Sequence, residues 1–191
     1  MRLITTAIVA SAFAAPAFAD FATDFGVGVS SGGQLVVEFN FASVEPIPEA
    51  TAPGFNGWVS DEPGFANFEE AEPDEDIFVM GANADIYFEL ISTTGDGFEV
   101  YDPFFSGPMA NGDTFALGGS SFDEHPFWTV NADSPDFDAS VFSYDVTFRL
   151  IDLGSTGYTA TENITVTFTR VPAPAAAGLL LAGAPLVRRR R

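Results

Sequence analysis

The sequence predicts an all-β protein, built as a single antiparallel β-sandwich of the jelly-roll or immunoglobulin-like type. Three observations support this fold class. Four segments alternate apolar and polar residues with the period of two that is typical of half-buried strands. No segment between the two ends of the chain shows the 3.6-residue periodicity of an amphipathic helix. The chain also contains 21 phenylalanines in 191 residues, enough to fill a core between two sheets.

The alternating segments are expected to form the strands of these sheets, because they are also rich in β-branched and aromatic residues. In the clearest case, residues 141–151, five apolar residues share one face: Phe142, Tyr144, Val146, Phe148 and Leu150. The other strong candidates are residues 35–41, 84–90 and 162–170, and the weaker ones are residues 77–80, 97–101, 114–117 and 127–131. We therefore expect about eight strands.

The first 19 residues have the features of a secretory signal peptide. Arg2 supplies the positive charge, an apolar stretch follows, and Ala17 and Ala19 flank Phe18 as a small-x-small cleavage site. Signal peptidase would release a chain that begins at Asp20. The β-sandwich domain is therefore expected over residues 20–170, a length suited to one domain.

The last 21 residues, 171–191, have three parts. Val171, Pro172, Ala173 and Pro174 form an extended motif, residues 175–187 are apolar, and Arg188, Arg189, Arg190 and Arg191 end the chain. As a helix, the apolar part would be roughly 20 Å long, shorter than the ~30 Å hydrocarbon core of a bilayer. The arginines would stay on the cytoplasmic side. A short hydrophobic helix of this kind predicts temporary membrane anchoring.

This tail resembles the PEP-CTERM sorting signals of Gram-negative bacteria, in the variant that opens with Val-Pro-x-Pro-Ala. Ala173 stands where the family usually has Glu. The resemblance implies export through the inner membrane, transient anchoring there, and recognition by an exosortase-type peptidase. It also implies a final location at the cell surface or in extracellular polymer. The rest of the chain is similar only to uncharacterised members, around residues 57–65 and 126–131.

Charge and composition exclude several classes of partner and site. Five of the seven basic residues lie in the two terminal segments, which leaves two arginines against 27 acidic residues. Nucleic acid is therefore excluded as a partner, since binding phosphates requires clustered cations. The chain has no cysteine and no lysine, so it has no disulfide, no thiolate metal site and no Lys-containing phosphate loop.

The sequence does not show a complete catalytic set, and we expect no enzymatic activity. Gly28-Val29-Ser30-Ser31-Gly32 fits the G-x-S-x-G pattern of a hydrolase nucleophile. That pattern requires a preceding buried strand and a following helix, whereas here we expect a flexible leader. His125 is the one histidine that could act as the base. Alone it cannot make a zinc site of the usual three or four N/S ligands, and carboxylates would have to supply the rest. Because it precedes Pro126 in an acidic loop, we expect it to be a surface residue.

Calcium is the one cation that the composition favours, since it prefers carboxylate and carbonyl oxygens. The candidate ligands are Asp123, Glu124, Asp133, Asp136 and Asp138. The alternative is that these acids form a solvated surface without a specific site. A structure in which all five converge would favour the calcium interpretation.

Two functions remain open from the sequence, with a small glycan-active enzyme as a more distant third. The preferred hypothesis is an exported, non-enzymatic structural or adhesive component of the cell surface or extracellular matrix. The alternative is a calcium-dependent carbohydrate-binding module associated with exopolysaccharide, in which Trp58, Tyr101 and Trp128 would stack on sugar rings.

Overall fold

A computed structural model of the chain describes residues 24–52 and 55–171. The predicted signal peptide, with Ala17 and Ala19, lies outside the described residues. So do Pro172, Ala173, Pro174, the predicted hydrophobic helix and the four terminal arginines. No helix within the described ranges is long and apolar enough to cross a membrane.

The regular structure of the described residues is almost all β and forms two sheets that pack together, which confirms the all-β, sandwich-like part of the prediction. The smaller sheet has the order β2-β1-β5-β9, and the larger has the order β7-β10-β4-β3-β12-β11-β6-β8. A single 3-10 helical turn, η1, covers Pro73–Glu75. The strands are β1 Phe25–Val29, β2 Leu35–Glu38, β3 Glu45–Ala52, β4 Phe55–Ser60, β5 Phe65–Asn67, β6 Ile86–Thr93, β7 Phe98–Tyr101, β8 Thr114–Gly118, β9 Asp123–Glu124, β10 Phe127–Asn131, β11 Ser143–Asp152 and β12 Ile164–Val171.

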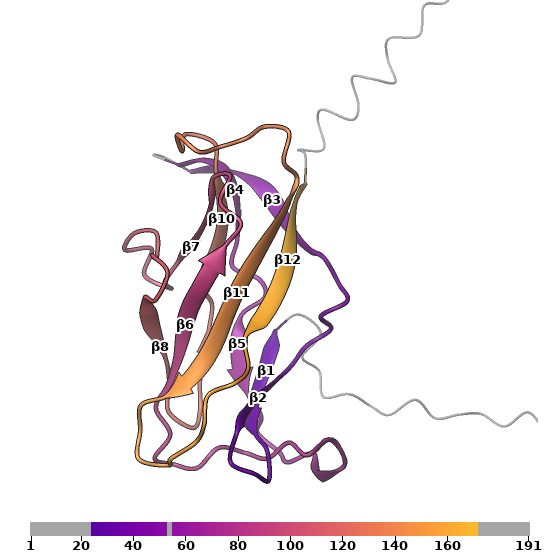
Figure 1. The fold of residues 1–191 in the computed structure, drawn as a ribbon, viewed down its shortest axis with the longest axis vertical. Helices are drawn as coiled ribbons and strands as arrows, with labels where there is room; N and C mark the ends of the chain where they lie inside the picture. Colours follow the sequence, from indigo (N-terminus) through magenta and orange to yellow (C-terminus); the bar gives the residue numbers. More distant parts are fainter. Residues whose placement is uncertain (1–23, 53–54, 172–191) are drawn as a thin grey trace, which may run out of the picture.

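The larger sheet extends along the length of the molecule, and the smaller sheet lies toward one end. Figure 1 shows β11 and β12 following the long axis, with β1, β2 and β5 at the lower end of the view. The loop that follows β10 lies at the opposite, upper end. The two ends of β10 therefore lead to different parts of the molecule.

Phenylalanines hold the two sheets together. Phe25 of β1 and Phe65 of β5 each lie 5.4 Å, between ring centroids, from Phe148 of β11, and Phe65 lies 5.7 Å from Phe88 of β6. All four rings are fully buried. Burying each such ring contributes about 1.5–3 kcal/mol, so these four rings help to stabilise the packing of the two sheets.

The sheets are mixed, which corrects the expectation of a purely antiparallel sandwich. β1 pairs with β5 in parallel, and β3 pairs with β12 in parallel. Parallel neighbours require a long crossover connection. The chain provides one because it passes through β2, β3 and β4 between β1 and β5, and through most of the domain between β3 and β12.

Most strands predicted by alternation are confirmed, with shifted ends. Residues 141–151 and 162–170 correspond to β11 and β12, and residues 84–90 correspond to β6. The weaker predictions at 97–101, 114–117 and 127–131 correspond to β7, β8 and β10. Residues 35–41 form a strand only as far as Glu38, and residues 77–80 contribute isolated bridges such as Val29 to Phe78.

The flexible leader expected before Leu35 is wrong. Residues Phe25–Val29 form β1, which is buried along its whole length. Gly28 is required there because a Cβ at this position would lie 2.6 Å from Cγ2 of Ile77. Ser30 begins the tight turn between β1 and β2, where its N–H donates to the Gln34 carbonyl (2.8 Å). A nucleophile elbow leads into a helix, so this turn between two strands does not form one.

β3 was not predicted because Pro46 and Pro48 interrupt its pattern. Its first half, Glu45 to Pro48, pairs with β12, and its second half, Glu49 to Ala52, pairs with β4. Proline cannot donate to a sheet ladder, but it is tolerated where one side of a strand has no partner. The prolines lie in the half that has a neighbour on one side only.

The end of β12 is fixed by an aromatic clamp, formed by Arg170, Trp58, Phe137 and Phe142. The guanidinium carbon of Arg170 lies 4.2 Å from the ring centroid of Phe142, 4.8 Å from that of Trp58 and 5.2 Å from that of Phe137. Its Nη2 donates to the Ala139 carbonyl, and the side chain is buried. The adjacent carbonyl of Val171 accepts a hydrogen bond from Trp58 Nε1 (3.1 Å).

Candidate metal centre

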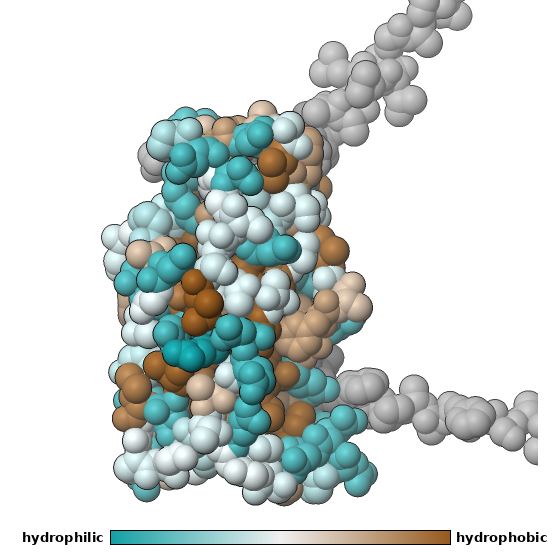
Figure 2. Space-filling model, viewed as in Figure 1, coloured by the Kyte–Doolittle hydropathy of each residue, from teal (hydrophilic) through white to brown (hydrophobic). Residues whose placement is uncertain are grey.

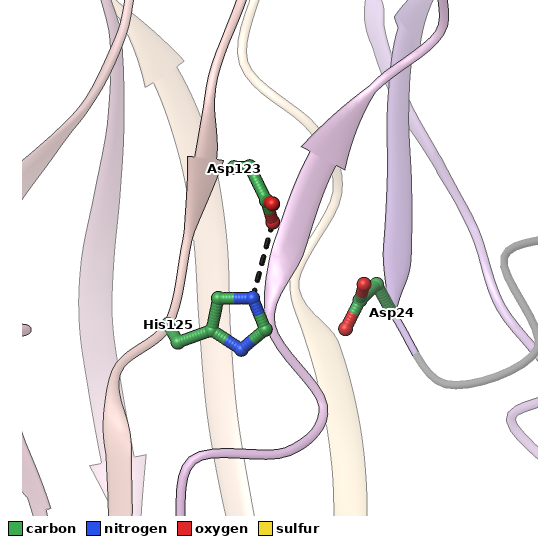
Figure 3. A group of neighbouring side chains, drawn as sticks. All are labelled: Asp24, Asp123 and His125. Atoms are coloured by element: carbon green, nitrogen blue, oxygen red, sulfur yellow. Dashed lines mark hydrogen bonds and ion pairs between the residues drawn. The ribbon is translucent and has the colours of Figure 1, made fainter.

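Three chemically reactive side chains come together at the end of the smaller sheet: Asp24, Asp123 and His125. Asp24 precedes β1, Asp123 lies in β9, and His125 lies between β9 and β10. Each offers one ligand atom, and these atoms all lie within 4.8 Å of one another. Figure 3 shows the Asp123 carboxylate and the Asp24 carboxylate on two sides of the His125 ring. We call these three residues the Asp–Asp–His cluster.

Strand register brings these residues together. β5 lies between β1 and β9, with Phe25 opposite Phe65 and Phe65 opposite Glu124. One residue further along the same register, Asp24, Gly64 and His125 form one row across the sheet. Because side chains alternate along a strand, this row faces away from the buried rings of Phe25 and Phe65. Asp123, two residues before His125, lies on the same face.

Gly64 provides the space in which the histidine ring lies. A Cβ at Gly64 would lie 2.5 Å from both Cε1 and Nδ1 of His125. With no side chain at the middle position of the row, His125 after β9 and Asp24 before β1 can approach each other across it. The Gly64 N–H donates to Asp24 Oδ1 (2.9 Å), and the Phe25 N–H donates to the Gly64 carbonyl (2.9 Å).

Both ring nitrogens of His125 face oxygen acceptors. Nδ1 lies 2.9 Å from the Asp61 carbonyl oxygen, and Nε2 lies 3.1 Å from Asp123 Oδ1. A neutral imidazole has one N–H only, so it can donate to one of these two acceptors. Both contacts are therefore satisfied only if the ring carries a second proton, or if Nδ1 carries the single proton and a cation lies between Nε2 and the Asp123 carboxylate.

The neighbouring acidic groups also favour a positive charge on or next to the His125 ring. Partial burial on its own would lower the pKa of His125, but the hydrogen bonds to Asp61 and Asp123 and the charges of Glu62 and Asp24 raise it above its ordinary value. The pKa of Glu62 is also raised, by burial first and then by its hydrogen bond to Asp24. Glu62 Oε1 lies 3.8 Å from His125 Nδ1.

A buried core residue fixes the loop that carries Asp61 and Glu62. Trp128, which is fully buried, donates its indole N–H to the Pro63 carbonyl (3.0 Å). Pro63 directly precedes Gly64, so this bond fixes the segment on which Asp24 and His125 depend. The positions of the cluster residues are therefore set by buried groups, although the side chain of Asp123 itself is 73% exposed.

An open hollow of about 660 Å³ adjoins the Asp–Asp–His cluster and shares Asp24 and Asp123 with it. Its other acidic lining residues are Glu69, Glu70 and Glu72, and Phe122 contributes an apolar part. Both arginines of the described ranges are engaged elsewhere, Arg149 with Glu89 and Arg170 in the aromatic clamp. The hollow therefore favours cations over anions.

No family of known proteins, no curated protein and no solved structure matches this chain.

The structure does not bring the five predicted calcium ligands together. Asp123 belongs to the Asp–Asp–His cluster, whereas Glu124 faces the opposite side of β9. Asp133, Asp136 and Asp138 follow the other end of β10, roughly 13 Å or more away at the rise of an extended strand. Asp133 accepts from Asn56 Nδ2 (3.0 Å), and Asp138 accepts from the Ser140 N–H and hydroxyl (both 2.7 Å).

Sequence reasoning missed Asp24 and assigned His125 to the surface. The His125 side chain is only 31% exposed and is held on both sides. Asp24 showed no local signal, because it reaches His125 only through the parallel pairing of β1 with β5. The one local indication was the glycine that ends Asp-Glu-Pro-Gly at 61–64, since a glycine lets another group approach the backbone closely.

Two of the aromatic residues expected to bind sugar are unavailable to it. Trp128 is fully buried and Tyr101 is 9% exposed. Trp58 packs against Arg170 and Phe137. Figure 2 shows hydrophobic side chains reaching the viewed surface in separate groups between hydrophilic ones. That face therefore does not present a broad apolar platform.

Proposed function

We propose that this protein is an exported, non-enzymatic β-sandwich that acts as a structural or adhesive component of the cell surface or extracellular matrix. In this proposal, signal peptidase removes residues 1–19, and an exosortase-type peptidase recognises the tail from Val171 onward during transient anchoring in the inner membrane. A jelly-roll or immunoglobulin-like relationship of the sandwich is part of the same proposal.

The observation that carries the proposal is the position of Val171. This residue ends β12, and it is also the first residue of the Val-Pro-Ala-Pro motif. The Arg170 clamp and the bond from Trp58 to the Val171 carbonyl fix the chain at this point. The proposed sorting motif would thus begin at the end of a strand, without a spacer. Processing would take place close against the folded domain or before folding is complete.

The test replaces Arg188, Arg189, Arg190 and Arg191 with alanine in the native host. The expected result is retention of the unprocessed tail, measured as the intact mass of the protein, together with loss of surface display. The matched control replaces the same four residues with lysine, which keeps the positive charge and should preserve membrane orientation. Normal maturation and display of the alanine variant would contradict the proposal.

The carbohydrate-binding alternative has less support, because Tyr101 and Trp128 are buried. Phe104, which is 86% exposed, would have to replace them. Phe41, Phe105 and Phe142 are also exposed, but their rings already pack against Phe39, Tyr101 and Arg170 respectively, which leaves less of each ring face for sugar stacking.

A further inference from the structure

We propose that Asp24, Asp123 and His125 bind one divalent first-row transition-metal ion, with Zn²⁺ as the best fit. This inference does not depend on the proposed surface role. It rests on the donor set, on the orientation of the histidine ring, and on the row that strand register creates at the end of the smaller sheet.

The donor set selects the class of metal. One imidazole nitrogen and two carboxylate oxygens lie within 4.8 Å of one another. Imidazole is a good ligand for Zn²⁺, Cu²⁺, Ni²⁺ and Fe²⁺, whereas Ca²⁺ and Mg²⁺ prefer ligand sets made of oxygen alone. The nitrogen therefore distinguishes this site from the calcium site expected from the acidic loops.

The orientation of His125 leaves Nε2 available to the metal. When Nδ1–H donates to the Asp61 carbonyl (2.9 Å), Nε2 carries the lone pair and points at Asp123 Oδ1 (3.1 Å). A lone pair facing a carboxylate is repulsive, and either protonation of Nε2 or a cation held by both groups removes this repulsion. A backbone carbonyl that accepts from the other ring nitrogen is also the usual support for a metal-binding histidine.

The second carboxylate is held in a similar way. Asp24 Oδ1 accepts from the Gly64 N–H (2.9 Å). Ligating carboxylates usually have such outer partners, which fix their direction. Asp24 and His125 are therefore positioned before a metal arrives.

Only a small adjustment would complete the site. Ligand atoms around Zn²⁺ lie about 2.0–2.2 Å from the metal and so roughly 3.5 Å from one another. Nε2 and Asp123 Oδ1 are already 3.1 Å apart, so only the longer separations, of up to 4.8 Å, must shorten, by about 1 Å. Asp123 can supply this movement because its side chain is 73% exposed. Three protein ligands leave a position for water on the open side, next to the acidic hollow.

The test is titration of metal-stripped protein with ZnCl₂, followed by calorimetry and thermal unfolding. We expect saturable binding of one equivalent. At free Zn²⁺ about 100-fold above Kd, the melting temperature should rise by roughly 5–10 °C. Each of the variants His125→Gln, Asp24→Asn and Asp123→Asn should weaken binding by about 100-fold or more. Asp123→Asn changes an exposed side chain, so it keeps the test valid if another variant fails to fold.

Matched controls separate a specific site from general acidity. Glu124→Gln removes the neighbouring carboxylate on the opposite face of β9, and Asp133→Asn removes one at the far end of β10; both should bind Zn²⁺ like the unaltered protein. CaCl₂ should give no stabilisation beyond that of NaCl at the same ionic strength. Zinc binding that is unchanged by His125→Gln, or calcium stabilisation equal to that by zinc, would overturn the proposal.

Discussion

The carboxylate of Asp152, at the end of β11, holds the loop that follows the strand through several hydrogen bonds. Its Oδ1 accepts from the N–H groups of Asp85 and Gly154 (both 2.9 Å), and its Oδ2 accepts from the Thr156 hydroxyl. Partial burial on its own would raise the pKa of Asp152, but these hydrogen bonds lower it below its ordinary value of 3.8. The ionised carboxylate is therefore part of the folded structure.

This residue should contribute to unfolding at acid pH. A carboxylate with a lowered pKa stabilises the fold fully above its unfolded pKa, and this contribution is lost as the pH falls through the lowered folded value. We expect Asp152→Asn to reduce the free energy of unfolding by about 1–3 kcal/mol near neutral pH and to flatten the loss of stability below about pH 4. Urea unfolding across this pH range provides the measurement. The control Asp74→Asn, which changes an exposed acid in η1, should alter neither the free energy of unfolding nor its dependence on acid pH. If Asp152→Asn lost stability below about pH 4 just as the unaltered protein does, Asp152 would not contribute to acid unfolding.

Gly64 explains why the Asp–Asp–His cluster could not be derived from sequence. Its importance depends on lying between Asp24 and His125 in a row that crosses three strands. Nothing in the local sequence indicates that β1 and β5 are parallel neighbours. His125 and Asp123 could be identified as candidate ligands, but their third partner could not, because it depends on sheet order and register.

At the scale of single elements, alternation predicted the long strands well and the short or unusual ones poorly. The pattern of β11 is regular because one face is buried and the other is open to water. β1 is buried on both faces, so its residues do not alternate in polarity. β3 contains two prolines, and β9 is only two residues long. The β-sandwich was therefore predictable, while its two parallel pairings were not.

The clamp at the end of β12 should be one of the more sensitive sites in the fold. Arg170 stacks on three aromatic rings, and such contacts contribute about 0.5–2 kcal/mol each when shielded from water. We expect Arg170→Ala to lower the free energy of unfolding by about 2–4 kcal/mol. Arg170→Lys should restore little of it, because an ammonium lacks the planar stacking surface of a guanidinium. Chemical denaturation monitored by tryptophan fluorescence would report both changes.

Arg149 on β11 provides the matched control. Its Nε donates to Glu89 Oε2 (2.7 Å), and its side chain is 41% exposed. An ion pair in contact with water contributes about 0–1 kcal/mol. Arg149→Ala should therefore have much the smaller effect. If the two alanine variants lost equal stability, the aromatic contacts of Arg170 would not be what fixes the end of β12.

For the molecule as a whole, the dominant electrostatic feature is its negative charge. The chain has 27 acidic residues, and its body outside the two terminal segments has two arginines. Repulsion between the carboxylates opposes the compact state, and dissolved salt screens it.

Stability should accordingly rise with ionic strength. We expect the melting temperature to increase by roughly 3–8 °C between about 10 mM and about 200 mM NaCl, measured by differential scanning calorimetry. The rise should level off at higher concentration, since the Debye length is already near 8 Å at about 0.15 M. A melting temperature that is independent of salt, or that increases only at molar concentrations, would show that charge repulsion is not a major term.

The position of β12 has a mechanical consequence. β12 lies inside the larger sheet, between β11 on one side and β3 on the other, and the chain leaves the described domain at its end. A force applied at Val171 is directed along a strand whose ladder bonds run across the pull. Those bonds must then shear together, whereas a strand pulled from an edge sideways can unzip one bond at a time. Tension applied at this end of the described domain would thus be resisted by β12, whose end is fixed by the Arg170 clamp.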